Sequence, residues 1–463
     1  MRFITTKSVQ PAVSFGFALF EGLAPDGGLY VPESIPRWAP EDLGRLTLSP
    51  GMTLGEVGAR VLQPYIDELD YDTLRSIVDD ALSFPIPLVE VEPGVFVLEL
   101  FHGPTLAFKD VGARVMARLM AALFRGDNPL TILVATSGDT GSAVAHAFHD
   151  VPHTRVVILY PKGRVSPTQE AQLTMFNSEA TNVRAYAAAG SFDDCQGLTK
   201  AAYADPVLSR RANLTSANSI NIGRLLPQMI YYAHAVGQLA IRDGGAVGDV
   251  VFSTPSGNFG NLTAGLMVKR AGLGIRRFVA ATNVNDVVPK YLVTGRFEPR
   301  PSIRTVANAM DVGDPSNFDR LMWLYGGKLD AVRRDVVGSR HDDDEVRATI
   351  KQVYETRGYL LDPHSAIAYL GLRGQEGRDG QEGRDKLGHA RTEVVSGFSR
   401  TDDRTAAGIF LATAHPAKFA EIVEPVIGRT IPKPQPLLDA LARERRILDI
   451  DATLEAVNKV VGP

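Results

Sequence analysis

Lysine is scarce in this sequence, and one lysine stands where it could act as a nucleophilic amine. The chain has 12 lysines against 37 arginines. Lys109 follows a turn at Gly103 and Pro104, has apolar neighbours and begins a helical pattern. Burial and the dipole of a helix N-terminus both disfavour the ammonium form, so a free amine becomes accessible there. The local sequence equally allows a surface lysine that pairs with Asp110.

Two loops rich in glycine and hydroxyl residues could bind an anion. Residues 137–142 (SGDTGS) follow one apolar strand, and residues 256–261 (SGNFGN) follow another. Free N–H groups at the start of a helix attract an anion, and glycine lets the backbone approach it closely. Each loop alone could be an ordinary tight turn. Together, at the carboxyl ends of strands in one sheet, they predict a ligand that carries phosphate.

Other catalytic motifs are missing from the sequence. It contains no Gly-x-Gly-x-x-Gly, no Walker loop and no Gly-x-Ser-x-Gly elbow. His146, His149 and His153 have a spacing like that of metal ligands, but Asp150 and Pro152 end their helix. No metal site is therefore expected.

Composition excludes several classes of function. The chain has 463 residues, which predicts two or three domains. The net charge is −4 and basic residues are scattered, so neither nucleic acid nor an anionic membrane is expected as a partner. No run approaches the roughly 20 apolar residues of a membrane helix, and the first residues lack the apolar stretch of a secretory signal. The single cysteine, Cys195, excludes intrachain disulfides and fits a reducing compartment, so a cytoplasmic protein is expected.

The elements that must position these residues alternate from about residue 130 onward. Continuous apolar strands are predicted at residues 131–135, 155–160, 249–253, 277–281 and 408–412, with helices from 141, over 167–176 and through 267. Such strands, separated by helices, indicate a parallel sheet that is buried on both faces. The catalytic region is therefore predicted to be α/β.

The first 95 residues and one later segment do not follow this alternation. A helical pattern covers residues 54–81, and Pro85 and Pro87 then suggest a linker, so an N-terminal domain is predicted at 1–95 and a catalytic region at 96–463. The hexapeptide GQEGRD occurs twice in tandem from residue 374. Because it contains no apolar residue, a disordered or exposed insertion is expected near 374–386.

Several of these stretches, in this order, resemble the threonine synthase family. They are residues 104–110 (PTLAFKD), 136–143 (TSGDTGSA), 256–261 and 410–416 (FLATAHP), with further agreement at 23–32, 218–221, 281–286 and 308–312. The resemblance runs from Met1 to about residue 428, interrupted at 374–386, and is to the longer microbial and fungal form. It implies an additional N-terminal domain ahead of a pyridoxal-phosphate (PLP) fold of type II, similar to the tryptophan synthase β chain and built from two α/β subdomains.

The resemblance also implies roles for individual residues. Lys109, beside Phe108, would bind the cofactor covalently and move protons, and Thr413 would contact the pyridine nitrogen. Asp139, where shorter relatives carry Asn, would lie near the cofactor's 3′-oxygen. The cofactor phosphate would be held by backbone N–H groups of the loop Ser256, Gly257, Asn258, Phe259, Gly260 and Asn261. For the substrate, Ser137 and Thr140 would bind its carboxylate or phosphate.

The resemblance further implies a second phosphate pocket, for the substrate, at Asn218, Ser219 and Arg224. Ser219 is predicted to start a helix, and Arg224, about one and a half turns on, could reach back to the same anion. A solvated charge on that helix is the alternative for Arg224.

The implied activity is the conversion of O-phospho-L-homoserine and water to L-threonine and phosphate, the last step of threonine biosynthesis. The protein is expected to be a monomer. Three other functions are compatible with parts of the sequence. A PLP lyase that turns the same ester into a keto acid would share nearly every motif, so only product analysis separates it. A dehydratase of serine or threonine would not need a second phosphate pocket. A non-catalytic binding protein would be expected to lose the lysine or the phosphate loop, and both are present.

Overall fold

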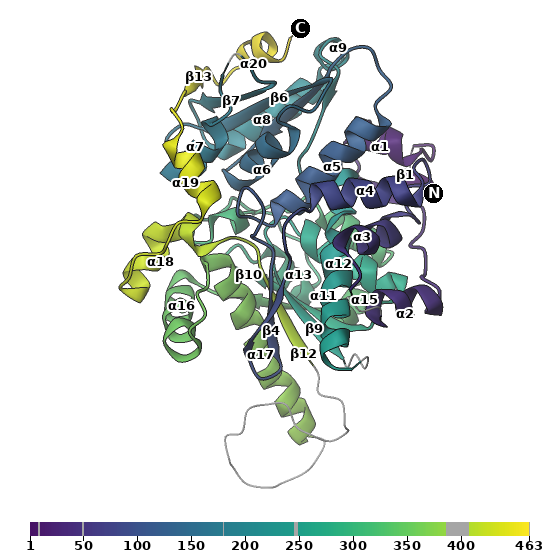
Figure 1. Cartoon of the computed structure of the whole chain (residues 1–463), viewed down its shortest axis with the longest axis vertical. Coiled ribbons are helices and arrows are strands. Elements are labelled where there is room, and N and C mark those ends of the chain that lie inside the picture. Colours follow the sequence, from purple (N-terminus) through teal and green to yellow (C-terminus); the bar gives the residue numbers. More distant parts are fainter. Residues whose placement is uncertain (8–9, 49–50, 179, 245–248, 386–406, 463) are drawn as a thin grey trace.

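Two large sheets organise the molecule, as the computed structural model of residues 1–7, 10–48, 51–178, 180–244, 249–385 and 407–462 shows (Figure 1). The six-stranded sheet has the order β11 (Val336–Arg340), β10 (Ile275–Thr282), β9 (Val250–Pro255), β12 (Ala407–Ala412), β4 (Val95–Glu99) and β3 (Leu88–Glu92). The five-stranded sheet has the order β13 (Leu448–Ile450), β7 (Val183–Ala188), β6 (Thr154–Pro161), β5 (Leu130–Ala135) and β8 (Leu214–Thr215).

Both sheets are essentially parallel and buried on both faces, as predicted. The antiparallel pair β3–β4 at one edge of the larger sheet is the exception. Every residue of β5, β9 and β12 is buried, which explains why their sequences are continuous apolar runs. All five predicted strands are confirmed, and candidate residues follow the carboxyl ends of three of them, β5, β9 and β12.

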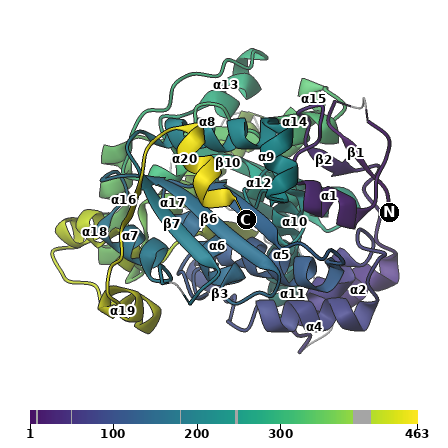
Figure 2. The ribbon, with the colours of Figure 1, turned by 90° about the horizontal axis from the view of Figure 1, so that it is seen from above.

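Helices cover the sheets on both sides (Figure 2). Those before residue 125 are α1 (Phe15–Glu21), α2 (Pro40–Leu48), α3 (Leu54–Leu62), α4 (Tyr71–Ala81) and α5 (Lys109–Leu123). The middle of the chain forms α6 (Asp139–Phe148), α7 (Pro167–Thr174), α8 (Phe192–Ala204), α9 (Pro206–Arg211), α10 (Ile222–Leu225), α11 (Gln228–Arg242), α12 (Gly260–Ala271) and α13 (Val287–Thr294). The last part forms η1 (Asn308–Met310), α14 (Phe318–Leu324), α15 (Leu329–Asp335), α16 (Asp343–Arg357), α17 (Pro363–Asp385), η2 (Pro416–Phe419), α18 (Ala420–Ile427), α19 (Gln435–Ala442) and α20 (Leu454–Val461).

The N-terminal segment contains a small antiparallel ribbon, β1 (Phe3–Thr5) with β2 (Tyr30–Pro32), and helices α1 to α4. The helical pattern over 54–81 is two helices, because Pro64 has no backbone N–H to donate to the preceding turn. The second helix starts afresh at Asp70, whose side chain accepts a hydrogen bond from the N–H of Thr73.

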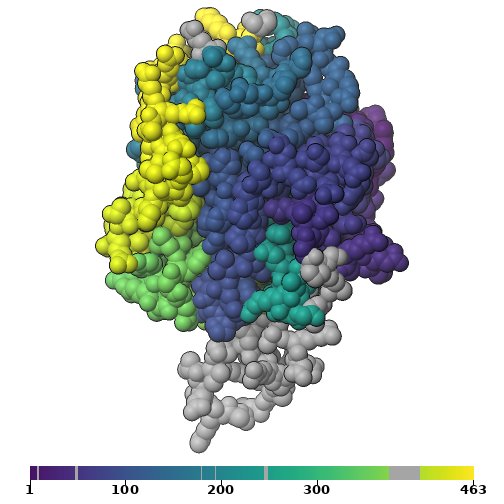
Figure 3. Space-filling model, in the orientation of Figure 1, coloured from purple at the N-terminus to yellow at the C-terminus, as the bar shows by residue number. Residues whose placement is uncertain are grey.

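This segment shares its hydrophobic core with the catalytic region. Phe3, Phe15 and Leu62 belong to the same buried cluster as residues of β5, β9 and β10. The space-filling view accordingly shows the purple N-terminal residues packed directly against the rest of the chain (Figure 3). Strand β3 precedes the boundary predicted at 95 but pairs within the large sheet. We therefore propose that the boundary lies between Ala81 and Leu88.

The glycine-rich tandem repeat is helical over the residues that the structure describes. Residues 374–385 continue helix α17, whose apolar half packs on β9, β10 and β12. The expectation of disorder is wrong for these residues, because a helix already anchored in the core can extend at little extra cost of nucleation. Residue 386 lies outside the described residues, and exposure of the repeat remains a prediction. Among the described helices, none is long and apolar enough to cross a membrane.

Candidate active site

Lys109 is the first residue of α5 and faces the interior of the site, with its side chain 16% exposed. The turn before it is held by Asp110, whose carboxylate accepts hydrogen bonds from the N–H and the hydroxyl of Thr105 at 2.9 and 2.7 Å. A Cβ at Gly103 would lie 2.4 Å from this carboxylate, so only glycine fits there. Since Asp110 is buried and bonded to Thr105, the alternative in which it pairs with a surface lysine is wrong.

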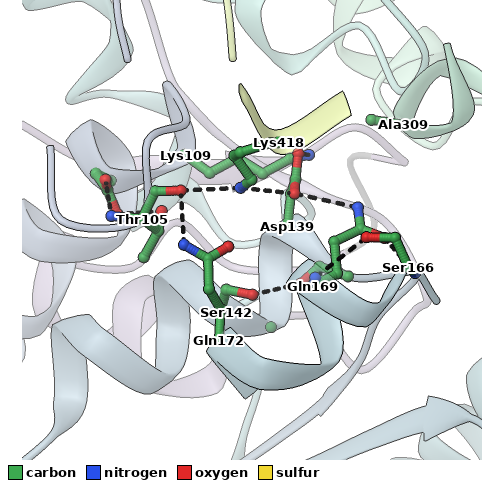
Figure 4. Close-up of polar contacts among 12 residues, drawn as sticks. Thr105, Lys109, Asp139, Ser142, Ser166, Gln169, Gln172, Ala309 and Lys418 are labelled. Carbon is green, nitrogen blue, oxygen red and sulfur yellow. Dashed lines mark hydrogen bonds and ion pairs between the residues drawn. The ribbon is translucent and has the colours of Figure 1, made fainter. Parts of the chain in front are cut away.

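The partner of the lysine amine is Asp139 at the start of α6. Nζ of Lys109 lies 3.9 Å from Oδ2 of Asp139 (Figure 4). Burial lowers the pKa of Lys109, and the positive charges of Lys418 and Arg224 lower it further, while Asp139 opposes them. A larger fraction of the Lys109 amine is therefore neutral, and so nucleophilic, in this site than it would be in water.

A second lysine, which sequence reasoning missed, neutralises this aspartate. Nζ of the fully buried Lys418, on η2, lies 2.8 Å from Oδ1 of Asp139 and donates to the carbonyl of Thr105 at 2.9 Å. Gln169 donates to the same Oδ1 at 3.2 Å. Although burial raises the pKa of Asp139, Lys418 and Lys109 together hold it well below its ordinary value. Asp139 is thus an ionised carboxylate with one oxygen committed to Lys418 and the other facing Lys109.

The loop between β9 and α12 forms a cradle of free donors. In the part of the chain that the structure describes, the backbone N–H groups of residues 257–261 donate to no protein acceptor. Phe259 adopts a left-handed conformation with φ of 60°, and a Cβ at Gly257 would meet the backbone of Met310 at 2.8 Å. The side chain of Asn261 accepts from the hydroxyl of Ser256 at 2.8 Å, which ties the loop ends together. The arrangement fits a phosphate.

The loop before α6 is organised around one hydroxyl, which occupies two of its N–H groups. Oγ1 of Thr136 accepts hydrogen bonds from the N–H groups of Gly138 and Gly141 at 3.0 and 2.8 Å. Ser137 is exposed and Thr140 is half-buried. Among the described residues, no hydrogen bond joins either of them to another candidate residue, so their roles remain predictions.

Thr413 is fixed beside Lys109 by backbone pairing. It follows β12, and its carbonyl accepts the N–H of Phe108 at 2.8 Å. Ala107 and Ala414 form an antiparallel bridge at the same place. The buried Thr413 and the lysine turn are therefore held together across two segments far apart in the sequence.

The second anion pocket is built differently from the prediction. Ser219 lies in a turn and does not start a helix; α10 begins at Ile222, because the side chain of Asn221 caps it by accepting from the N–H of Gly223. Arg224 is only 5% exposed, so the alternative of a solvated helix charge is wrong. Its Nη1 donates to the carbonyl of Ala217 at 2.6 Å.

The cradle at residues 257–261 and the turn that carries Ser219 are in direct contact. Nδ2 of Asn258 donates to the hydroxyl of Ser219 at 2.6 Å. Asn258 also accepts the N–H of Ser316 at 2.6 Å, which fixes its amide. Two sets of anion donors thus lie side by side, at the carboxyl end of β9 and in the turn after β8.

Comparison with known proteins agrees with this geometry. Residues 83–387 match the family model of pyridoxal-phosphate-dependent enzymes, and residues 2–82 and 393–461 match those of the threonine synthase N terminus and C-terminal region. The chain is 44% identical over 443 residues to threonine synthase of Haemophilus influenzae and 41% identical over 440 residues to that of Escherichia coli, covering 94% of each relative.

Solved structures lead to the same family. The Escherichia coli threonine synthase superposes with a TM-score of 0.86 at 39% identity, covering 99% of both chains. A PLP-bound threonine synthase from Brucella melitensis gives 0.86 at 35% identity, covering 100% of this chain and 98% of that one. The chain belongs to the threonine synthase family. It is a PLP-dependent lyase of fold type II with the threonine synthase function, and its substrate is a small molecule.

The residues present fit the threonine synthase cofactor. The largely enclosed amine of Lys109 and the cradle of N–H groups at 257–261 supply the two features that an aldehyde with a phosphate arm requires. The histidines with metal-like spacing are engaged otherwise, since His146 and His149 pack against Phe176 with ring centres 4.9 and 4.3 Å away. Among the described residues, no cluster of His, Cys, Asp or Glu could hold a metal ion.

Because Lys418 and Asp139 form a buried ion pair, removing one charge of this threonine synthase should destabilise it more than removing both. Lys418→Met leaves a buried carboxylate without its closest countercharge and should lower the free energy of unfolding by about 3–5 kcal/mol. Asp139→Asn combined with Lys418→Met removes both charges and should recover most of that loss. Urea denaturation of the four proteins in a double-mutant cycle measures the coupling.

The matched control is Lys162→Met. Lys162 forms an ion pair of the same length, 2.8 Å, with Asp449, but both partners are more than half exposed. That pair should contribute no more than about 1 kcal/mol. A loss for Lys418→Met as small as that for Lys162→Met would contradict the assigned role.

Proposed function

We propose that this enzyme converts O-phospho-L-homoserine and water to L-threonine and phosphate at the site around Lys109. The observation that carries the proposal is the hydrogen bond between Asn258 and Ser219, which places two groups of anion donors next to each other. One accommodates the phosphate of the cofactor at residues 257–261. The other is available to the phosphate of the substrate, which a dehydratase acting on a free amino acid would not need.

The cofactor site is assigned to four groups of residues. Lys109 would bind PLP covalently beside Phe108, and Thr413 would contact the pyridine nitrogen. Asp139 would lie near the 3′-oxygen, and Ser256 to Asn261 would hold the phosphate. When bound, PLP supplies an electron sink that makes protons on the α and β carbons of an amino acid removable.

Proton transfer is assigned to Lys109. Its amine is disposed to the neutral form by burial and by its charged neighbours, which is the form that a base needs. It would take the proton from the substrate's α carbon. Loss of a β proton would then allow phosphate to leave the γ carbon, water would add at the β carbon, and protons would return to the γ and α carbons. Asp139, held by Lys418, remains a carboxylate during these steps because its pKa is far below neutral pH.

Departure of phosphate is assigned to the second pocket. The leaving group gains negative charge, so fixed positive groups beside it stabilise the transition state. Arg224 is a buried guanidinium, and the N–H groups of Ser219 and Ile220 donate to no acceptor among the described residues. Ser137 and Thr140 would hold the substrate's other anionic end.

We also infer that the enzyme is a monomer that acts in the cytoplasm and binds no nucleic acid. The support is the scattered distribution of basic residues and the single cysteine, Cys195, which is fully buried with its thiol pKa raised by burial. A buried thiol of that kind does not form intermolecular disulfides.

Replacing Lys109 tests the reaction and the cofactor together. Lys109→Ala should lose the absorbance of lysine-bound PLP and all threonine formation, because no other amine takes the same place. Products from O-phospho-L-homoserine are identified by mass spectrometry for the wild-type protein with and without added PLP. Threonine is the expected product; a keto acid from the wild type, or an unchanged spectrum in the variant, contradicts the proposal.

Replacing Arg224 tests the second pocket. Arg224→Ala should lower kcat/KM for O-phospho-L-homoserine by about 10²–10³-fold, equivalent to about 2.7–4 kcal/mol of transition-state stabilisation. The cofactor absorbance should persist, since the cradle at 257–261 is intact. Arg210→Ala, at an exposed arginine, serves as control, and near-wild-type kinetics of Arg224→Ala would refute the assignment.

A further inference from the structure

Arg320, on α14, is a fully buried cation without a counterion. It is 0% exposed, and among the described residues no carboxylate forms an ion pair with it. Burial lowers its pKa to about 9, which leaves the guanidinium charged at neutral pH. A buried charge that faces only neutral dipoles is unfavourable unless another charge compensates it.

All the hydrogen bonds of this guanidinium go to neutral acceptors that connect three segments. Nε and Nη2 donate to the carbonyl of Tyr30 in β2 at 3.1 and 3.0 Å. Nη1 donates to the carbonyl of Ser219 at 3.1 Å and to Oδ1 of Asn317 at 2.9 Å. Nη2 also donates to the carbonyl of Ile220 at 2.6 Å. Arg320 therefore joins the N-terminal segment to the turn that carries Ser219.

These bonds determine the direction of one of the turn's donors, the N–H of Ile220. In a trans peptide the N–H points opposite to the carbonyl, so the N–H of Ile220 points away from Arg320 when the carbonyl of Ser219 points toward it. The carbonyl of Ala217 is taken by a second buried arginine, Arg224. The turn is thus backed by two cations, and the N–H groups of Ser219 and Ile220 are left without acceptors among the described residues.

We propose that Arg320 is a positioning residue for the substrate: it fixes the turn at Ser219 and Ile220 against β2 and supplies the positive charge that attracts a phosphate monoester to the other side of that turn. This rests on the proposed function and adds to it a role for the N-terminal segment. The ligand's negative charge would provide the compensation that the protein itself does not supply. Arg320 touches no substrate and acts through the peptide groups of the turn.

An isosteric change at Asn317 tests the charge without removing the arginine. Asn317→Asp places a carboxylate 2.9 Å from Nη1, so the charge of Arg320 is cancelled while its hydrogen bonds to Tyr30, Ser219 and Ile220 remain possible. The holoenzyme should show at least a tenfold rise in KM for O-phospho-L-homoserine and in the inhibition constant of inorganic phosphate. The change in kcat should be smaller, and the cofactor absorbance should stay unchanged.

Two further variants separate charge from geometry. Arg320→Lys keeps the charge but loses the fork of donors, and Arg320→Met loses both, so the rise in KM should be larger for the methionine variant. Arg333→Met is the control, because Arg333 also donates to backbone carbonyls, those of Leu292 and Val293, but is 40% exposed. It should leave KM unchanged.

Each outcome decides the proposal. If Asn317→Asp binds inorganic phosphate and substrate as the wild type does, the charge of Arg320 does not serve the phosphate and the proposal is overturned. It is also overturned if the variants lose the cofactor while KM stays the same. Failure of the proposed function would look different, because the wild-type enzyme itself would then form no threonine.

Discussion

The buried carboxylate of Asp139, between two lysines, is the interaction on which the site depends. Two ammonium groups could not share so small a buried space without an anion between them. Because Lys418 and Gln169 occupy one oxygen of Asp139, the other oxygen is oriented toward Lys109. The charge of Asp139 is thereby neutralised, and Lys109 keeps a lowered pKa instead of being locked into a strong ion pair.

The rest of the fold can be understood as the means of holding these three side chains. The start of α5 supplies Lys109, the start of α6 supplies Asp139, and the segment after β12 supplies Lys418. Each comes from the carboxyl end of a strand or from a turn next to one, where parallel sheets place ligands. Backbone pairing at Phe108 and Thr413 and the bond of Lys418 to Thr105 lock the segments together. The N-terminal segment contributes in turn through Tyr30 and Arg320.

The sequence predicted the features that depend on residues close together in the chain. Continuous apolar runs revealed the buried strands, and the lysine between a Gly-Pro turn and a helical pattern revealed the start of α5. The glycine-rich loops were recognisable because an anion cradle needs glycine and free N–H groups. Ser219 was misplaced at a helix start because the capping side chain is that of Asn221, two residues later. The helix break before Tyr71 was missed although Pro64 marks it.

Residues that act through distant partners could not be predicted in this way. Lys418 lies in an apolar stretch beyond Thr413, but nothing near it in the sequence identifies Asp139 as its partner. Arg320 looks like an ordinary helix arginine until the carbonyls of Tyr30 and Ser219 are seen around it. Such residues are determined by tertiary packing, and a lysine in an apolar segment is the one sequence feature that could have drawn attention to Lys418.

The central claim, that Lys109 and not its buried neighbour carries the cofactor, has a direct test. The PLP-loaded enzyme is reduced with borohydride, digested and analysed by peptide mass spectrometry. The account predicts that the added phosphopyridoxyl mass is found on the peptide that contains Lys109. Finding it on the peptide with Lys418, or on no lysine at all, would contradict the account.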